Sequence, residues 1–240
     1  METGHTKNIS NFLSFIGYLA GWGTDYKPVN PAIALAVLQA LHPTYETAVK
    51  AVDDQKKIFD DLKDKRKIVF NTHKPLATRV VNSFSSLNLP QETIDGAISI
   101  NLKIQGRRAS PKKDAKPDDP NAPKYNSSSQ QSFDLSVKYF HDLITWVSQQ
   151  PAYLPNEADL KVANLNSYYG KLDSTNKAVI AGKIPYDNKL DARDTLLYAP
   201  ETGMLDLVKA VKKYAISAFG TRSPRYKQIS GIKFNKPRNR

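Results

Sequence analysis

The sequence predicts an all-α protein: two homologous antiparallel helical bundles that arose by internal duplication and are joined by a disordered linker. Three observations carry this prediction. Apolar residues recur at helical spacing through most of the chain, residues 105–132 are too polar to form a core, and the segments on either side of them match at a constant offset. We therefore expect an N-terminal helical repeat at 1–104, a flexible linker at 105–132 and a C-terminal helical repeat with a basic tail at 133–240, each repeat closing its own core.

The linker is predicted from its composition. Residues 105–132 read QGRRASPKKDAKPDDPNAPKYNSSSQQS, with four prolines and a single aromatic residue, Tyr125. Such a segment buries too little apolar surface to offset the entropy of ordering it. We expect the linker to be mobile and open to proteolysis without unfolding either half.

An offset of 127 residues aligns the two halves. Eleven identities fall within the 55 positions from 12 to 66, among them Tyr26 with Tyr153 and Arg66 with Arg193. The alignment then continues at an offset of 135, which pairs Lys74 with Lys209, Val81 with Ile216, Phe84 with Phe219 and Gly96 with Gly231. Eleven identities can arise by chance between helical segments, but the shared order of the motifs favours duplication.

In the first half, helical spacing of apolar residues covers 8–20, 32–70 and 75–86. Asn30 is suited to cap a helix with Pro31 in its first turn, and Pro43 is expected to kink or split the long helix because proline lacks the amide donor. Residues 94–104 alternate in part between apolar and polar, which favours a short strand or an extended strap.

The second half predicts helices from about 132 to 149, from 156 to 198 and from 204 to 219. Ser132 or Asp134 is expected to cap the first of these and Asn156 the second. Gly182 and Pro185 should interrupt the second helix near residue 184, and Gly220 is suited to the C-terminal cap of the third.

The net charge of +12 is unevenly distributed. Residues 1–102 carry +1 and residues 132–199 carry −1, whereas residues 103–131 carry +4 and residues 200–240 carry +8. A basic excess gathered in tails predicts either attraction to a polyanion or added solubility. The candidate polyanion-binding residues are Arg222, Arg225, Lys227, Lys233, Lys236, Arg238 and Arg240. In the alternative interpretation, Ile229, Ile232 and Phe234 strap this segment onto the helical bundle and its charges are only solvated.

No catalytic, cofactor or metal motif stands out. The chain has no cysteine, and its four histidines (His5, His42, His73 and His141) lack metal-motif spacing, so we interpret them as surface or helix-end residues. Asp60 and Asp64 could share a hard cation with Asp187 and Asp191, but the lysines interleaved with them favour an ion-pair face.

Two further groups have a structural and a functional interpretation. Arg66 and Arg193 are better suited to anchor ion pairs than to bind a ligand. Six aromatic residues could offer stacking surfaces, but their helical spacing favours the core, with tyrosine hydroxyls reaching the rim. These residues are Tyr168, Tyr169, Tyr198, Tyr214, Phe219 and Tyr226.

Residues 133–236 resemble a widespread type of uncharacterised bacterial protein that is built of repeated helical units. The likeness is carried by the residues Tyr153, Pro155-Asn156-Glu157, Ala192-Arg193-Asp194, Leu197-Tyr198, Gly203, Val211-Lys212-Lys213-Tyr214, Phe219-Gly220, Ser223 and the segment from Tyr226 to Phe234. The first half matches less well, because Phe84-Ser85 replaces the Phe-Gly pair and Arg79 stands opposite Tyr214. The resemblance implies a helical fold and no particular activity.

The function expected from the sequence is a non-enzymatic structural or protein-interaction module in the cytoplasm, without cofactor or membrane span and with an unknown protein partner. The alternative is sequence-nonspecific binding of nucleic acid or another polyanion by the linker and the basic C-terminal segment. An enzyme is the least favoured class. Salt-dependent retention on a polyanion would distinguish the polyanion-binding protein from the interaction module.

Overall fold

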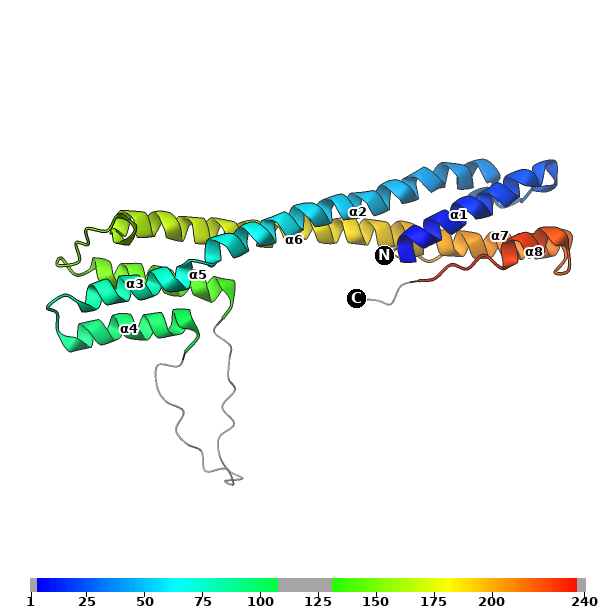
Figure 1. Ribbon diagram of the computed structural model, residues 1–240. Helices are drawn as coiled ribbons and strands as arrows, with labels where there is room; N and C mark the ends of the chain where they lie inside the picture. Colours follow the sequence, from blue (N-terminus) through cyan, green and yellow to red (C-terminus); the bar gives the residue numbers. More distant parts are fainter. Residues whose placement is uncertain (1–3, 108–130, 237–240) are drawn as a thin grey trace, which may run out of the picture. The chain divides into compact units, whose positions relative to one another are not determined.

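The computed structural model describes residues 4–107 and 131–236, and within these ranges every regular element is a helix, so the all-α prediction is confirmed. The chain divides into two units (Figure 1): unit 1 comprises Met1–Phe59 and Lys183–Arg240, and unit 2 comprises Asp60–Gly182. Most of the expected linker, residues 108–130, lies outside the described residues.

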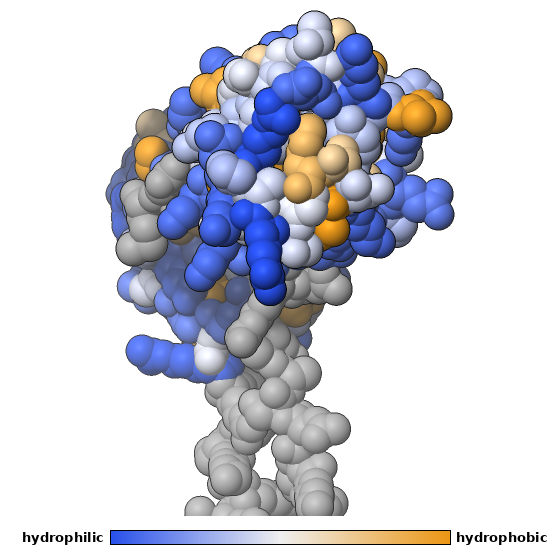
Figure 2. Space-filling model, turned by 90° about the vertical axis from the view of Figure 1, so that its right-hand side faces the viewer, coloured by the Kyte–Doolittle hydropathy of each residue, from blue (hydrophilic) through white to orange (hydrophobic). Residues whose placement is uncertain are grey.

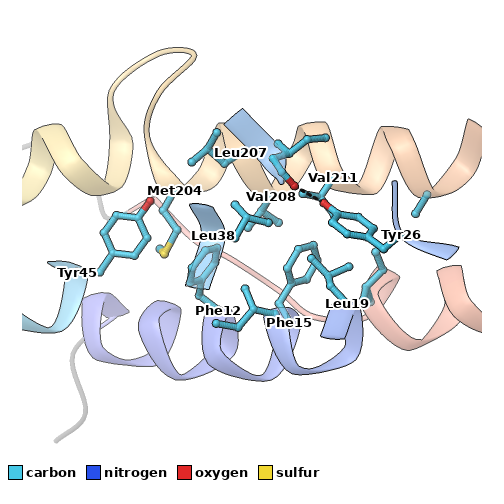
Figure 3. Close-up of a cluster of buried hydrophobic side chains, with 14 of the residues drawn as sticks. Phe12, Phe15, Leu19, Tyr26, Leu38, Tyr45, Met204, Leu207, Val208 and Val211 are labelled. Carbon is cyan, nitrogen blue, oxygen red and sulfur yellow. Dashed lines mark hydrogen bonds between the residues drawn. The ribbon is translucent and has the colours of Figure 1, made fainter. Parts of the chain in front are cut away.

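Unit 1 is built from helices of both halves of the sequence. It contains α1 (Gly4–Gly21), the 3-10 turns η1 (Gly23–Asp25) and η2 (Pro31–Ile33), and the first part of α2 (Leu35–Phe70). The end of α6 (Val162–Tyr198), α7 (Met204–Phe219) and α8 (Pro224–Ser230) complete it. Figure 3 shows side chains of α1 and α2, such as Phe12 and Leu38, facing Leu207 and Val211 of α7 in one core.

Unit 2 also combines both halves. The end of α2, α3 (His73–Ser85) and α4 (Gln91–Gln105) pack with α5 (Phe133–Ser148), η3 (Ala158–Leu160) and the first part of α6. Phe84 of α3 and Phe140 of α5 are both fully buried in this core. The expectation that each half closes its own core is therefore wrong for the described residues: the apolar faces of α1 and α5 are covered by α7 and α3, which come from the other half.

Residues 91–105 form a helix, α4, and the predicted strand or strap at 94–104 is wrong. The buried positions are Ile94, Ala97 and Ile104, which lie at helical rather than alternating spacing. Gly96 allows α4 to approach α5, because a β-carbon at this position would overlap the indole ring of Trp146. Trp146 also donates a hydrogen bond of 2.9 Å from its indole nitrogen to the carbonyl oxygen of Thr93.

The long helices α2 and α6 run through their prolines without a break, so the interruption expected at Gly182 and Pro185 and a split at Pro43 are wrong. In α2, the fully buried Leu38 and Tyr45 hold the helix on both sides of Pro43. Gln39, whose carbonyl oxygen loses its amide donor at Pro43, is exposed, as is Pro43 itself, so water can replace this hydrogen bond.

The helix ends follow the predicted signals in part. Asn30 accepts a hydrogen bond of 3.0 Å from the backbone amide of Ala32 at the start of η2, and the side chain of Ser132 caps α5. Gly220, with φ of 82°, follows the last residue of α7 as expected. Asn156 does not cap α6, because the turn η3 is placed between them.

The burial of the second copy does not follow the offset of 135. Val81 and Phe84 are buried, whereas their predicted counterparts Ile216 and Phe219 are 36% exposed and half-buried, respectively. Helix α7 turns a different set of residues inward, led by Met204, Leu207, Val208 and Val211.

Candidate functional site

The basic C-terminal segment forms α8 and then an extended strap, which we define as residues 231–236. Figure 1 shows this strap running from α8 along α1. Within it, Ile232 and Phe234 are half-buried, and Lys233, Asn235 and Lys236 are exposed. This alternation is that of an extended chain lying on an apolar surface.

The strap is bound to α1 through its backbone. The side chain of Asn8, which is 2% exposed, donates a hydrogen bond of 2.8 Å to the carbonyl oxygen of Asn235 and accepts one of 3.1 Å from its backbone amide. One helical turn further on, the side-chain amide of Asn11 donates to the carbonyl oxygen of Lys233 at 2.7 Å. The two asparagines fix the register of the strap, since both partners are backbone groups two residues apart.

The apolar side of the strap contacts α1 and α7. The ring of Phe234 lies edge-on to Phe15, with 5.9 Å between ring centroids. On α7, the ammonium group of Lys212 donates to the carbonyl oxygens of Ser230 and Ile232 and lies 5.9 Å from the Phe234 ring centroid. Burial lowers the pKa of Lys212, and its two carbonyl partners serve as hydrogen-bond acceptors in place of water.

The structure gives the predicted polyanion-binding residues different surroundings. Arg222, Lys227, Lys233 and Lys236 are exposed. Arg225 instead forms an ion pair with Asp25, and its guanidinium carbon lies 4.9 Å from the centroid of the Phe219 ring. Arg238 and Arg240 lie outside the described residues. Four of the seven predicted cations are therefore exposed: Arg222 just before α8, Lys227 in α8, and Lys233 and Lys236 in the strap.

Two loops at equivalent positions of the halves are held by the same kind of hydrogen bond, which was not predicted from the sequence. The hydroxyl of Tyr26 donates to the carbonyl oxygen of Ile33 at 2.6 Å, and that of Tyr153 donates to the carbonyl oxygen of Leu160 at 3.0 Å. Figure 3 marks the first of these bonds. Both rings are buried, and burial raises the pKa of Tyr153 to about 12. The identical spacing of these tyrosines and their acceptors was visible in the sequence, but nothing there marked a backbone carbonyl as the partner.

Unit 1 has a hollow of about 940 Å³ beside the strap. His5 and Tyr198 line it, with 2.8 Å between the His5 Nδ1 atom and the Tyr198 hydroxyl. The buried Arg193 binds the carboxylate of Asp194 through two nitrogens, as expected for a structural ion pair. Acidic side chains and basic side chains both line the hollow, so the charges favour no single class of ligand.

The predicted ion-pair interpretation of the acidic residues of α2 is supported. Asp54 pairs with Lys50 and Lys57, and Asp60 pairs with Lys63. Among the described residues, no three acidic or histidine side chains come together as a metal site would require. Also within these residues, no helix combines the length and apolarity needed to cross a lipid bilayer.

Arg66 makes a different contact from the ion pair expected. It donates to the side-chain oxygen of Asn176 at 2.9 Å, and Asn176 in turn donates to the Asp134 carboxylate at 2.6 Å. The guanidinium carbon stacks 3.7 Å from the centroid of the Phe133 ring. Asn176 thus connects Arg66 to Asp134 through two hydrogen bonds. These three residues join α2, α5 and α6 within unit 2.

The predicted rim position of the aromatic hydroxyls is supported. Tyr168 donates to the Val69 carbonyl oxygen at 2.6 Å, and the Tyr214 hydroxyl accepts from the Lys27 amide at 2.9 Å. The six aromatic residues of that set are all half-buried. These tyrosines therefore join helices and loops through their hydroxyl groups.

Two of the four histidines are buried, contrary to the surface interpretation of His42. His73, the first residue of α3, lies within hydrogen-bond distance of the Phe70 carbonyl oxygen through Nδ1, while its buried Nε2 has no hydrogen-bond partner among the described residues. Burial, aided by the nearby Lys74, lowers the pKa of His73. Protonation would place an unpaired N–H⁺ in the core.

We expect His73 to make unit 2 less stable at low pH. Its folded pKa lies below the unfolded value of about 6.5, so the unfolded state binds more protons in the window between the two. The free energy of unfolding should therefore be highest above that unfolded pKa and should fall by up to about 1.4 kcal/mol per pH unit below it. Urea unfolding of the parent and of His73→Phe between pH 7.5 and 5 tests this, because only the parent carries this contribution. Equal slopes for the two proteins would contradict it.

Comparison with known protein families, curated proteins and solved structures finds no match to this chain.

Proposed function

We propose that the chain is a non-enzymatic structural or protein-interaction module of the cytoplasm. The observation that carries this proposal is that the side chains best suited to chemistry serve structural contacts. Arg193 is paired with Asp194 and Arg79 with Asp159, while the hydroxyl of Tyr168 is bonded to the backbone. An active site needs groups held ready for a substrate rather than used by the fold.

The proposal is tested with the purified full chain immobilised in an extract of its source cell. We expect one or a few proteins to be retained after nuclease treatment at physiological salt and to bind again when purified. Retention of nucleic acid alone, or of nothing, would contradict the interaction role. Turnover of a substrate by the purified chain would contradict its non-enzymatic character.

We also infer that the two halves arose by duplication. Support comes from the equal offset of 127 residues between the two tyrosine–carbonyl hydrogen bonds. Phe59 and Tyr186, which are themselves 127 residues apart, stack on each other with 5.6 Å between ring centroids. Stacking between equivalent positions is expected where two copies meet about an approximate twofold axis.

The second candidate function is nonspecific polyanion binding. The observation that favours it is the outward direction of Lys233, whose carbonyl oxygen is held by Asn11 while its side chain is exposed. Binding should be weak, indifferent to sequence and steeply salt-dependent, because each neutralised phosphate releases a counterion.

Glutamine replacement tests this candidate. A variant with Arg222, Lys227, Lys233 and Lys236 replaced should lose nucleic-acid affinity and show a shallower salt dependence. The matched control replaces the same number of exposed lysines of unit 2, namely Lys65, Lys67, Lys161 and Lys171. Parent protein that does not bind at about 50 mM salt, or equal loss in both variants, would exclude α8 and the strap as the binding surface.

A further inference from the structure

Among the residues that the structure describes, each unit has one large apolar side chain that is more than four-fifths exposed, on the loop that its buried tyrosine holds. Val29, three residues after Tyr26, is 99% exposed, and Leu154, directly after Tyr153, is 82% exposed. Single exposed apolar residues are common on protein surfaces. Val29 and Leu154 are unlike such scattered residues, because they lie on equivalent loops of the two halves. Each loop connects the first and the second long helix of its half.

Both loops are ordered before any partner arrives. The loop of unit 1 is held by the Tyr26 hydroxyl and by the bond from the Lys27 amide to the Tyr214 hydroxyl, and prolines at 28 and 31 restrict its backbone. The loop of unit 2 is held by Tyr153 and by a bond from the side-chain amide of Asn164 to the Ala158 carbonyl oxygen. A contact made by a rigid loop costs little ordering entropy.

The surroundings of Val29 are basic. Arg225 pairs with Asp25, which brings the start of α8 against η1 and the loop. Because that pair is neutral, Lys27 and Arg222, both exposed, set the sign of this end of unit 1. Figure 2 views this end of unit 1 and shows small apolar patches among strongly hydrophilic residues. We call residues 22–30 with 219–226 the basic end.

The surroundings of Leu154 are acidic. The ring of Tyr153 lies 5.9 Å from that of Phe84, and Trp146 bonds to Thr93, so the end of α3 and the start of α4 lie beside this loop. The described charges here are Glu92, Asp95, Glu157, Asp159 and Lys161. Asp159 is neutralised by Arg79, and the three remaining carboxylates outnumber the single lysine. We call residues 86–95 with 149–161 the acidic end.

We propose that the basic end of one copy of the chain binds the acidic end of a second copy. The partner is a second copy because the chain itself carries both members of a complementary pair. One is a rigid loop with an exposed apolar side chain among cations, and the other is a rigid loop with an exposed apolar side chain among carboxylates. Two basic ends repel each other, as do two acidic ends, so the charges select the head-to-tail pairing.

A head-to-tail contact uses two different surfaces, so it leaves one end of each kind free and propagates into open chains unless the geometry closes a ring. The contact surfaces are small, which makes the association weak and dependent on concentration. Added salt screens the exposed charges and should dissociate the assemblies. The inference goes beyond the proposed function, because it names the chain itself as a partner and is tested without any cell extract.

Charge reversal at one end at a time gives a sharp test. Variant A carries Lys27→Glu and Arg222→Glu, so both of its ends are acidic; variant B carries Glu92→Lys and Glu157→Lys, so both of its ends are basic. Sedimentation equilibrium of the full chain at about 50 mM salt should show a mass that rises with concentration for the parent and a monomer for either variant alone. An equimolar mixture of A and B should associate again.

A third variant, Val29→Ser with Leu154→Ser, tests the apolar loops. It should self-associate at least about tenfold more weakly than the parent, which is the scale of losing an apolar contact on each side.

Several outcomes would overturn the inference. The parent remaining a monomer at low salt is one, and failure of A and B to associate on mixing is another, provided that circular dichroism shows both to be folded. Unchanged self-association of the serine variant would remove the apolar loops from the contact. If instead the basic end binds anionic lipid vesicles or nucleic acid while the parent does not self-associate, the partner of that end is not a second copy. A partner found in the cell extract would leave the proposed function standing in each of these cases.

Discussion

Residues 1–107 and residues 131–240, produced as separate polypeptides, will each fail to form a stable fold and will regain the native helices when they are mixed. The reason lies in the composition of the two cores. The described core of unit 1 takes ten buried side chains from the first half and seven from the second, and that of unit 2 takes seven and nine. Neither half can close either core alone.

The size of this effect follows from the burial. A large apolar side chain contributes about 1.5–3 kcal/mol when it is fully buried. Losing the seven partners that the second half supplies to unit 1 therefore removes on the order of 10 kcal/mol, which is comparable with the whole stability of a domain. Hairpins such as α1 with the start of α2 would be left with an exposed apolar face.

Circular dichroism and analytical ultracentrifugation check this expectation. Each fragment alone should show reduced helicity without a cooperative thermal transition, and the mixture should form a 1:1 complex whose melting temperature rises with concentration. The control is the parent chain cut within the linker, which should keep its helicity because the halves remain bound to each other. A cooperative transition in either isolated fragment would show that a half closes its own core, as the sequence alone led us to expect.

The sequence predicted most of the helices, α4 and α8 excepted, but it did not predict which helices share a core. Helical spacing shows which face of a helix is buried, and α1, α5 and α7 were found in this way. The same spacing does not say which partner covers that face. Since residues 35–66 of α2 align with residues 162–193 of α6 at the offset of 127, pairing within a half and pairing between halves are both compatible with the apolar pattern.

The hydrogen bonds that hold the strap and the two loops were not predicted, although Ile232 and Phe234 do pack on the core of unit 1, as one interpretation of the sequence expected. Asn8 and Asn11 look like ordinary polar residues of an amphipathic helix, yet their amides bind the backbone of residues 233 and 235. Recognition of backbone by side-chain amides leaves no mark in the composition of the partner segment. The basic charge of the C-terminal segment was visible in the sequence, whereas its attachment to α1 required the tertiary structure.

Phe84→Ala will destabilise unit 2 by about 3–5 kcal/mol, the cost of removing a fully buried phenylalanine ring and leaving a cavity. Phe84 is 0% exposed and its ring lies 5.9 Å from that of Tyr153, so the cavity would open beside the tyrosine that fixes the acidic end. Chemical denaturation followed by circular dichroism measures the loss. Phe84→Leu is the matched control and should cost less than about 1.5 kcal/mol, because a second apolar side chain fills most of the same space.

Phe219→Ala tests whether burial or the position in the repeat determines how much stability an alanine substitution removes. The offset of 135 predicts that Phe84 and Phe219 are equivalent and that their losses are equal. The half-buried Phe219 instead lies edge-on to Trp22, with ring centroids 5.3 Å apart, beneath Arg225 at the surface of unit 1. We therefore expect Phe219→Ala to cost about 1–2 kcal/mol, since only part of the ring leaves an apolar environment. Equal losses for the two alanine variants would restore their equivalence, whereas a negligible loss for Phe84→Ala would show that the contact of α3 with α5 and η3 does not hold unit 2 together.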